Sequence, residues 1–348
     1  FFEYPRLFLD NEKKLIEIFK EVSSRGSFIL QKDLENFEKN LADFTGANYA
    51  IGVGNATDAL EIILKVAGIG LGDEVLISTH TMIATAGAIN HVGASAIPVD
   101  IGEDHLIDYD QIEKNITDKT KAIMPTQLNG RTCNMDIICK IADKYDLLLF
   151  EDAAQGLGSK FKNKSAGTFG LASAISFYPA KNLGSLGDGG AIILNDESLY
   201  KEIISYRDHG RDPRNGKVMS WGVNSRLDNL QAAFLNHFLT KYNLVIERRR
   251  NIANLYNEYL KDLSEINLPP SPENELEHFD VFQNYEIRAE NRDALRNYLQ
   301  EHNIGTLIQW SGMAIHHHKN LGFTQELAKA DEFFEKILML PMNMFISD

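Results

Sequence analysis

The sequence predicts an α/β protein with a large, mostly parallel sheet domain followed by a smaller C-terminal α/β domain. Its 348 residues exceed what one simple core usually holds. From about residue 47 to residue 196, short apolar runs alternate with helical patterns, and long helices follow after residue 196. Because the apolar runs show little polar alternation, helices should cover both faces of the predicted sheet.

The strands predicted for the large sheet are residues 49–54, 74–78, 95–101, 121–128, 147–154, 172–179 and 189–196. Helical patterns lie between several of them, in TDALEIILKVAG, TMIATAGAINHVG and NMDIICKIADKYD. Strands that alternate with helices in this way are typical of a parallel sheet.

The C-terminal part predicts a second, smaller unit. Residues 226–262 predict one or two long helices, and Pro269-Pro270 with the acidic stretch SPENELEHFD predicts a loop. A strand is expected in VFQNYEIR, a helix in NRDALRNYLQEHN and a strand in GTLIQW. The expected domains are residues 1–240 and 241–348, with residues 1–25 packed on the small domain or on a partner subunit.

Charge, cysteine content and hydropathy exclude several classes of partner. The net charge of -14 disfavours binding to nucleic acid and to anionic membranes, and no apolar run approaches the ~20 residues that span a bilayer. Cys133 and Cys139 have neither redox-motif nor zinc-site spacing, which favours reduced thiols in a cytoplasmic protein. The first residues carry early charges and no cleavage-site pattern, so we expect no signal peptide. Because an initiator Met is missing, we expect the natural chain to begin earlier.

Ligands of parallel α/β sheets bind outside the carboxyl ends of the strands, so the strand-to-helix corners are the candidate sites. In the first corner, GVGNATDAL, a strand ends in small residues and a helix begins at Thr57. Backbone N–H groups and the helix dipole bind anions at such a point, and the Thr57 hydroxyl could add a hydrogen bond to a phosphate. The alternative is a plain N-cap by Asn55 or Thr57.

The second corner, LLLFEDAAQGLGS, places Asp152 directly after a strongly apolar strand. A carboxylate is costly there unless it has a partner, and a pyridinium nitrogen is a suitable one. Gln155 follows about one helical turn later, within reach of a phenolic oxygen on the same ring. The alternative is an Asp that only caps the next helix.

The third corner, ISFYPAKNLGSLGDGGA, places Lys181 in a glycine-rich turn between two apolar strands. Burial favours an uncharged amine, which is the form that attacks a carbonyl to give a Schiff base. Ser176 ends the preceding strand and could bind a phosphate. The alternative for Lys181 alone is a solvated loop lysine, so the combination of the three corners decides the interpretation.

Together the ordered segments EDAAQ, SFYPAKNLG-x-x-GDGG and G-x-N-x-RLD resemble the DegT/StrS family of nucleotide-sugar aminotransferases. These are fold-type-I enzymes that use pyridoxal 5'-phosphate (PLP). The resemblance runs from RGSFILQKDLENF to LPMNM, which is nearly the whole chain. It implies a large seven-stranded domain, a smaller C-terminal domain and a homodimer with shared active sites.

The resemblance also implies roles for individual residues. Lys181 corresponds to the lysine that binds PLP covalently, Asp152 to the partner of the pyridine nitrogen, and Gln155 to the partner of the ring oxygen. Three positions correspond to phosphate contacts, namely Thr57, Asp58 and Ser176. Asn224 corresponds to an asparagine that reaches the phosphate from the neighbouring subunit.

Three segments depart from the family pattern. Met82 stands where an aromatic residue usually stacks on the cofactor ring, and a methionine can still cover a ring through its sulfur. The common HLYG becomes QLNG, with Gln127 and Asn129. The usual HYP-type substrate segment becomes IQWSGMAIHHHKNLGF, which is more similar to the members that act on 3-keto-6-deoxy sugars.

Four residues are expected to contact the substrate, namely His316, Tyr178, Arg211 and Trp310. The run of three histidines at 316–318 predicts a loop near the substrate mouth and no metal site, because consecutive residues rarely face one ion and no acidic ligand stands beside them. Arg211 and Arg214 could bind a diphosphate or a carboxylate. The alternative is that His209-Gly210 only ends a helix. The three arginines at 248–250 predict a solvated helix face.

These expectations combine into one reaction. By resemblance, L-glutamate gives its amino group to PLP, 2-oxoglutarate leaves, and the group passes to a nucleotide-linked keto-6-deoxyhexose, with dTDP-3-keto sugars favoured. Ping-pong kinetics follow from this order. The alternatives are a 4-keto substrate and a non-catalytic regulator that binds PLP or a sugar nucleotide.

Overall fold

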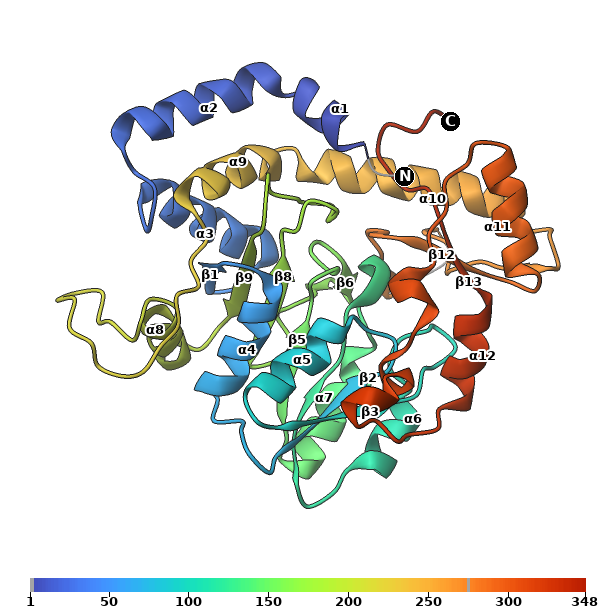
Figure 1. Cartoon of the computed structure of the whole chain (residues 1–348), viewed down its shortest axis with the longest axis horizontal. Helices are drawn as coiled ribbons and strands as arrows, with labels where there is room; N and C mark the ends of the chain where they lie inside the picture. The colour runs from blue at the N-terminus through green and yellow to red at the C-terminus, as the bar shows by residue number, and fades with distance from the viewer. Residues whose placement is uncertain (1–2, 274–275) are drawn as a thin grey trace.

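A computed structural model describes residues 3–273 and 276–348. Residues 1–2 of the predicted N-terminal segment and residues 274–275 within the predicted acidic loop lie outside the described residues. A seven-stranded sheet in the order β1-β9-β8-β5-β4-β2-β3 forms the centre of the molecule (Figure 1). β9 runs antiparallel to β1 and β8, while β8, β5, β4, β2 and β3 run parallel. The predicted mostly parallel sheet is therefore confirmed. Its strands are β1 (Tyr49–Val53), β2 (Glu74–Ser78), β3 (Ser95–Val99), β4 (Thr120–Met124), β5 (Leu148–Asp152), β8 (Ala172–Ser176) and β9 (Gly190–Leu194).

Helices cover both faces of this sheet, as the apolar strands require. Adjacent strand residues face opposite ways: Ile51 packs in a core with α4, α5 and α8, and Ala50 packs in another with α3 and α9. A third core joins the sheet to α6 and α7. The helices are α3 (Lys32–Thr45), α4 (Ala56–Val66), α5 (Ile83–His91), α6 (Tyr109–Ile112), α7 (Met135–Tyr145), α8 (Glu197–Tyr206) and α9 (Asn229–Leu239). A small sheet, β11-β6-β7, lies beside them, formed by β6 (Lys160–Phe161), β7 (Lys164–Ser165) and β11 (His278–Phe279).

The N-terminal helices α1 (Tyr4–Leu9) and α2 (Glu12–Arg25) lie over α9 (Figure 1). Leu15, Ile18 and Val22 form one apolar face of α2 and pack against Phe234 of α9. Within the chain, α2 therefore packs on α9 of the large unit, and the expected packing of residues 1–25 on a partner subunit stays a prediction. Helix α1 approaches the C-terminal segment, where Arg6 lies 4.7 Å from the ring centre of Phe345.

The C-terminal unit contains a three-stranded antiparallel sheet, β10-β12-β13, with α11 and α12 beside it. Its elements are α10 (Tyr242–Leu260), β10 (Ile266–Asn267), β12 (Tyr285–Ala289), α11 (Arg292–Glu301), α12 (Ala328–Lys336) and β13 (Ile337–Leu340). The strand predicted in GTLIQW is wrong. Leu307 alone bridges to Met339, and Gln309–Gly312 form a 3-10 turn in which Trp310 and Ser311 have φ of 47° and 58°. Such angles are incompatible with a strand.

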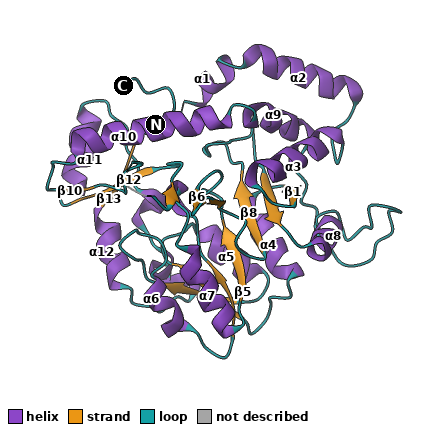
Figure 2. Cartoon of the chain, turned by 180° about the vertical axis from the view of Figure 1, so that it is seen from behind, coloured by secondary structure: helices purple, strands orange, loops and turns teal. Residues whose placement is uncertain are grey.

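Helix α10 runs from the large unit to the small one (Figure 1 and Figure 2). Tyr242 and Ile246 pack in the large core, and Ile252 and Ala253 pack in the small core. Residues 240–241 separate the end of α9 from the start of α10. They lie close to the domain boundary predicted near residue 240, and that boundary stays a prediction. Among the described residues, no helix combines the length and the apolar character needed to cross a membrane.

The arginine run at 248–250 on α10 is not the solvated face that its charge predicted. Arg249 is buried and donates hydrogen bonds to the carbonyls of Phe282 and Gln283, at 3.0 and 3.4 Å. Burial lowers the pKa of Arg249 to about 10. Arg250 also binds two carbonyl groups, those of Asp280 and Pro272. These arginines therefore tie α10 to the chain segment before β12.

Candidate active site

The three predicted corners meet at one edge of the large sheet. In the ladder, Val53 of β1 pairs with Gly190 of β9, and Gly190 pairs with Ser176 of β8. One strand further, Asp152 pairs with Ala174. Gly190 must be glycine, because a Cβ there would lie 2.4 Å from the backbone carbon of Asn55. The absent side chain lets the start of α4 approach the ends of β8 and β5.

Asp152 is a buried carboxylate at the end of β5, with 4% of its surface exposed. One oxygen accepts a hydrogen bond from Thr85 Oγ1 at 2.6 Å, and the other accepts one from the Ala154 amide at 3.1 Å. Burial raises the pKa of Asp152, while these bonds and the nearby Lys181 oppose the rise. A buried carboxylate held by two donors is suited to stabilise a cationic nitrogen.

Three threonine hydroxyls lead to this carboxylate. Thr126 donates to Thr81 at 2.8 Å, Thr81 and Thr85 share a bond of 2.8 Å, and Thr85 donates to Asp152. Because Thr85 has one proton and gives it to Asp152, its oxygen must accept from Thr81. The chain of hydroxyls fixes the direction of each bond and keeps an O–H donor directed at Asp152.

Lys181 lies in the connection between β8 and β9, and its amide donates to the Tyr178 carbonyl at 2.8 Å. Burial lowers the pKa of the Lys181 amine to about 8, although the negative charge of Asp152 opposes the shift. The lowered pKa increases the uncharged fraction of the amine near neutral pH, and the uncharged amine is the form that a Schiff-base lysine requires. The alternative of a solvated loop lysine does not fit this environment.

At the first corner, Asn55 caps α4, since its Oδ1 accepts the Asp58 amide at 2.8 Å. The Asp58 carboxylate accepts from Ser225 Oγ at 2.6 Å, and Ser225 in turn accepts the Gly54 amide at 3.0 Å. The backbone amide and the carboxylate of Asp58 are thus both hydrogen-bonded within the protein, and the negative charge of the carboxylate would repel a phosphate. We retain Thr57 as a proposed phosphate contact and assign Asp58 to holding Ser225.

Ser176 completes this corner from the end of β8. Its hydroxyl oxygen accepts the Tyr178 amide at 3.2 Å, so its proton is directed elsewhere and can be donated to an anion. Thr57 lies in the first turn of α4, where the dipole favours negative charge. The donors of the corner therefore fit a phosphate group.

Gln155 is oriented by a neighbouring loop. Its Oε1 accepts the Asn129 amide at 2.9 Å, which fixes the side-chain orientation and leaves Nε2 as a donor. Asn129 also donates to Glu286 at 2.9 Å and accepts from Asn284 at 2.8 Å. The QLNG departure thus places an amide between the predicted ring-oxygen partner and β12 of the small unit.

The remaining predicted contacts are largely exposed in the chain. Met82 precedes α5 and is 51% exposed, and Tyr178 is 54% exposed. Arg211 lies 3.8 Å from Asp208. Asn224 is exposed and forms a backbone bridge with Asp208. Trp310 is partly buried, and its ring packs edge-on against His80 at 5.3 Å.

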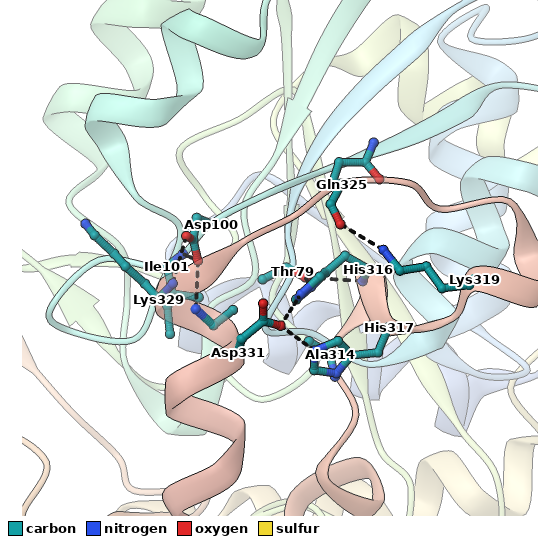
Figure 3. Close-up of polar contacts among 11 residues, drawn as sticks. Thr79, Asp100, Ile101, Ala314, His316, His317, Lys319, Gln325, Lys329 and Asp331 are labelled. Carbon is teal, nitrogen blue, oxygen red and sulfur yellow. Dashed lines mark hydrogen bonds and ion pairs between the residues drawn. The ribbon is translucent and has the colours of Figure 1, made fainter.

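His316, predicted in a loop near the substrate mouth, is a buried side chain in the structure. It is 1% exposed, with Nδ1 2.7 Å from Thr79 Oγ1 and Nε2 2.8 Å from Asp331 Oδ1 (Figure 3). Burial lowers the pKa of His316, while the hydrogen bond to Asp331 opposes this. Both ring nitrogens are used within the protein, so we do not retain His316 as a substrate contact.

The structure also brings an acidic residue to these histidines, which the sequence had not indicated. His317 Nε2 lies 2.7 Å from the same Asp331 oxygen, and the ligand atoms of the three residues lie within 4.8 Å of one another. The Ala314 amide donates to His317 Nδ1 at 3.1 Å, which places the ring proton on Nε2. A metal ion would need the lone pair of that Nε2. The arrangement is therefore a hydrogen-bonded clamp between α12 and the preceding turn.

Several residues at the site gave no sequence signal. Thr85 contacts Asp152 across 67 positions, and no spacing rule in a single sequence joins them. His80 and Glu286 form a buried pair with 3.4 Å between Nε2 and Oε2, which joins the end of β2 to β12. The amide side chain of Gln283 contacts the Lys181 turn. Each is visible only once the chain is folded.

Comparison with known proteins agrees with this geometry. The model of the DegT/DnrJ/EryC1/StrS aminotransferase family matches residues 10–348. The chain belongs to this family. The predicted family, the aminotransferase class and the PLP cofactor are thereby confirmed. The buried carboxylate, the amine of lowered pKa and the hydrogen-bond donors at the first corner fit PLP.

Three proteins of known name or structure are similar to this chain over nearly its whole length and over most of their own. The chain is 37% identical to a pleiotropic regulatory protein of Geobacillus stearothermophilus, over 94% of this chain and 89% of that protein. It is 36% identical to a dTDP-3-amino-3,6-dideoxy-alpha-D-galactopyranose transaminase of Aneurinibacillus thermoaerophilus, over 100% and 95%. The crystal structure of S. venezuelae DesV in complex with a ketimine intermediate has a TM-score of 0.94, with 32% identity and coverage of 99% and 93%.

Proposed function

We propose that this family member transfers the amino group of L-glutamate to a dTDP-linked 3-keto-6-deoxyhexose. The observation that carries the chemistry is that buried Asp152 acts on Lys181 at one edge of the sheet, where burial lowers the pKa of the Lys181 amine to about 8. The relative that acts on a dTDP-3-amino-3,6-dideoxy sugar supports the choice of substrate class. A 4-keto sugar nucleotide is the alternative substrate.

The residues divide the work as follows. Bound PLP supplies an electron sink for the bond broken at the amino acid Cα. Asp152 would keep a positive charge on the ring nitrogen, and Gln155 Nε2 would donate to the ring oxygen. Lys181 Nζ would accept the proton that leaves the substrate Cα and return it later in the reaction. Thr57 and Ser176 hold the phosphate end.

The test is an absorbance spectrum of the protein with PLP, recorded before and after addition of L-glutamate. The wild type should show a band near ~420 nm, typical of PLP bound to a lysine, that bleaches with the amino donor. Lys181→Ala should lack this protein-linked band and should not trap PLP covalently on borohydride reduction. An equal covalent adduct in the alanine variant would remove Lys181 from its role.

Substrate choice needs a second step with the pyridoxamine form of the enzyme. A dTDP-3-keto-6-deoxyhexose should restore the ~420 nm band at least about tenfold faster than the matched 4-keto sugar, the minimum discrimination expected from one misplaced reacting group. The reverse order would favour the 4-keto alternative. A protein that binds PLP but bleaches with none of the amino donors would favour a regulator, the description given to one relative.

We also propose a homodimer, since the loop between α8 and α9 projects from the body of the molecule (Figure 1). It carries exposed apolar side chains, with Trp221 95%, Met219 69% and Val218 67% exposed. Exposed apolar groups of this size typically mark a protein interface. Asn224 is exposed at the end of the same loop and is thus available to a second subunit.

Subunit mixing tests this arrangement. Lys181→Ala and Asn224→Ala proteins, each of low activity, are unfolded together, refolded and assayed. If Asn224 acts across the interface, half of the dimers are hybrids with one intact site of two, and about a quarter of wild-type activity returns. If Asn224 acts within its own subunit, no activity returns above the sum of the parents.

A further inference from the structure

The side-chain amide of Gln283 brackets Lys181. Gln283 Nε2 donates to the Ala180 carbonyl at 2.9 Å, and Gln283 Oε1 accepts the Asn182 amide at 2.9 Å. These two groups belong to the peptide bonds on either side of the Lys181 Cα. One contact is a carbonyl and the other an N–H, so the orientation of the side-chain amide is fixed. Gln283 thus holds the backbone of the cofactor lysine at both ends.

The segment that carries Gln283 is itself held firmly. Gln283 is 7% exposed, and Arg249 donates to the carbonyls of Phe282 and Gln283. The amide of Val281 donates to the Gly130 carbonyl at 2.8 Å. Phe282 has φ of 48°, which is rare for a bulky side chain and persists only where its surroundings enforce it. The clamp therefore acts from a rigid support outside the large sheet.

We propose that Gln283 is a positioning residue that sets the orientation of Lys181. This inference rests on the proposed function, in which Lys181 Nζ binds PLP and moves the proton. Fixing both flanking peptides fixes the direction in which the Lys181 Cα–Cβ bond leaves the turn. The amine then lies in the field of Asp152, which is the charge that opposes its lowered pKa. A second consequence is that the small unit, through the segment before β12, helps to set the geometry of the amine.

The same connection contains a matched control. Gln231 of α9 makes an equivalent two-bond clamp, accepting the Leu186 amide at 2.9 Å and donating to the Leu186 carbonyl at 3.2 Å. This clamp lies five positions beyond Lys181. Gln231→Leu therefore removes the same kind of support from the same connection, without touching the peptides beside Lys181.

The experiment compares wild type, Gln283→Leu, Gln283→Glu and Gln231→Leu. In protein without cofactor, hydrogen exchange at the Asn182 amide should accelerate about tenfold or more in Gln283→Leu and little in Gln283→Glu, which keeps the acceptor. With PLP, Gln283→Leu should bleach with L-glutamate about 10- to 100-fold more slowly, since small misplacement of a reacting group has effects of this size. The pH dependence of the bleaching rate should also shift in Gln283→Leu. Gln231→Leu should stay within twofold.

The outcomes separate this inference from the function on which it rests. A wild type with no ~420 nm band would overturn both. A normal wild type beside a Gln283→Leu variant with lower thermal stability but unchanged bleaching rate and pH profile would overturn the positioning role alone. If Gln283→Leu does not fold, Gln283→Glu is the deciding variant, because it loses the N–H group that donates to the Ala180 carbonyl. Its bleaching rate should then be lower than that of wild type and higher than the rate predicted for Gln283→Leu. A wild-type rate and pH profile there would overturn the proposal.

Discussion

Asp152→Asn is expected to slow the half-reaction with L-glutamate by about 10²–10⁴-fold. Removing one partner of a buried charge pair typically costs about 3–5 kcal/mol, which converts to a rate change of this size when the charge stabilises the transition state. Asn has nearly the same shape but cannot keep a positive charge on the ring nitrogen. The measurement is the single-turnover decay of the ~420 nm band after mixing with L-glutamate.

Thr85, which holds the Asp152 carboxylate, provides a second test of this prediction. Thr85→Val keeps the shape but removes the 2.6 Å bond to Asp152, and a lost hydrogen bond to a charged group costs about 1.5–3 kcal/mol. We expect a decay about 10- to 100-fold slower, restored by Thr85→Ser, which keeps the hydroxyl. A rate for Asp152→Asn within threefold of wild type would show that the charge of Asp152 has no part in the reaction.

The large sheet and its three corners could be predicted because their signals are local. Each strand contains a short apolar run, and a side chain directly after such a run must lie at the strand's carboxyl end. Lys181 and Asp152 were identified in this way, and the resemblance to a family added their roles. The structure places both where the spacing required.

Contacts that depend on tertiary packing could not be predicted. Charge suggested that Arg249 faces water, but two backbone carbonyls satisfy its guanidinium in a buried position. The GTLIQW segment has strand-like composition, but packing of Trp310 on His80 accompanies left-handed angles that are incompatible with a strand. Asp331 meets the histidines across 14 and 15 positions, because α12 folds back on the turn before it. In each case a distant partner overrides the local preference.

Glu151, next to Asp152 on β5, is a buried carboxylate whose contacts indicate a structural role and no part in the reaction. It is fully buried and points to the opposite face of the strand. Its carboxylate accepts four N–H bonds, from the Gln127 side chain and from the amides of Gly167, Phe169 and Gly170, at 2.7 to 3.0 Å. Burial raises the pKa of Glu151, and these donors oppose the rise. Since all four contacts are donors, neither oxygen has an acceptor for a carboxylic proton.

Glu151→Gln should therefore destabilise the fold strongly without entering the chemistry. The new amide group would face N–H donors, leaving buried groups unpaired at a cost of about 3–5 kcal/mol. With an unfolding entropy of roughly 2 cal/mol/K per residue, this corresponds to a melting temperature about 4–7 °C lower. Thermal unfolding followed by circular dichroism measures the shift. Glu277→Gln, whose side chain is 55% exposed and pairs with Lys162, should change the melting temperature by less than about 1.5 °C. Equal melting temperatures for the two variants would contradict a structural role for Glu151, whereas a large loss in Glu151→Gln with an intact ~420 nm band at low temperature would separate it from Asp152.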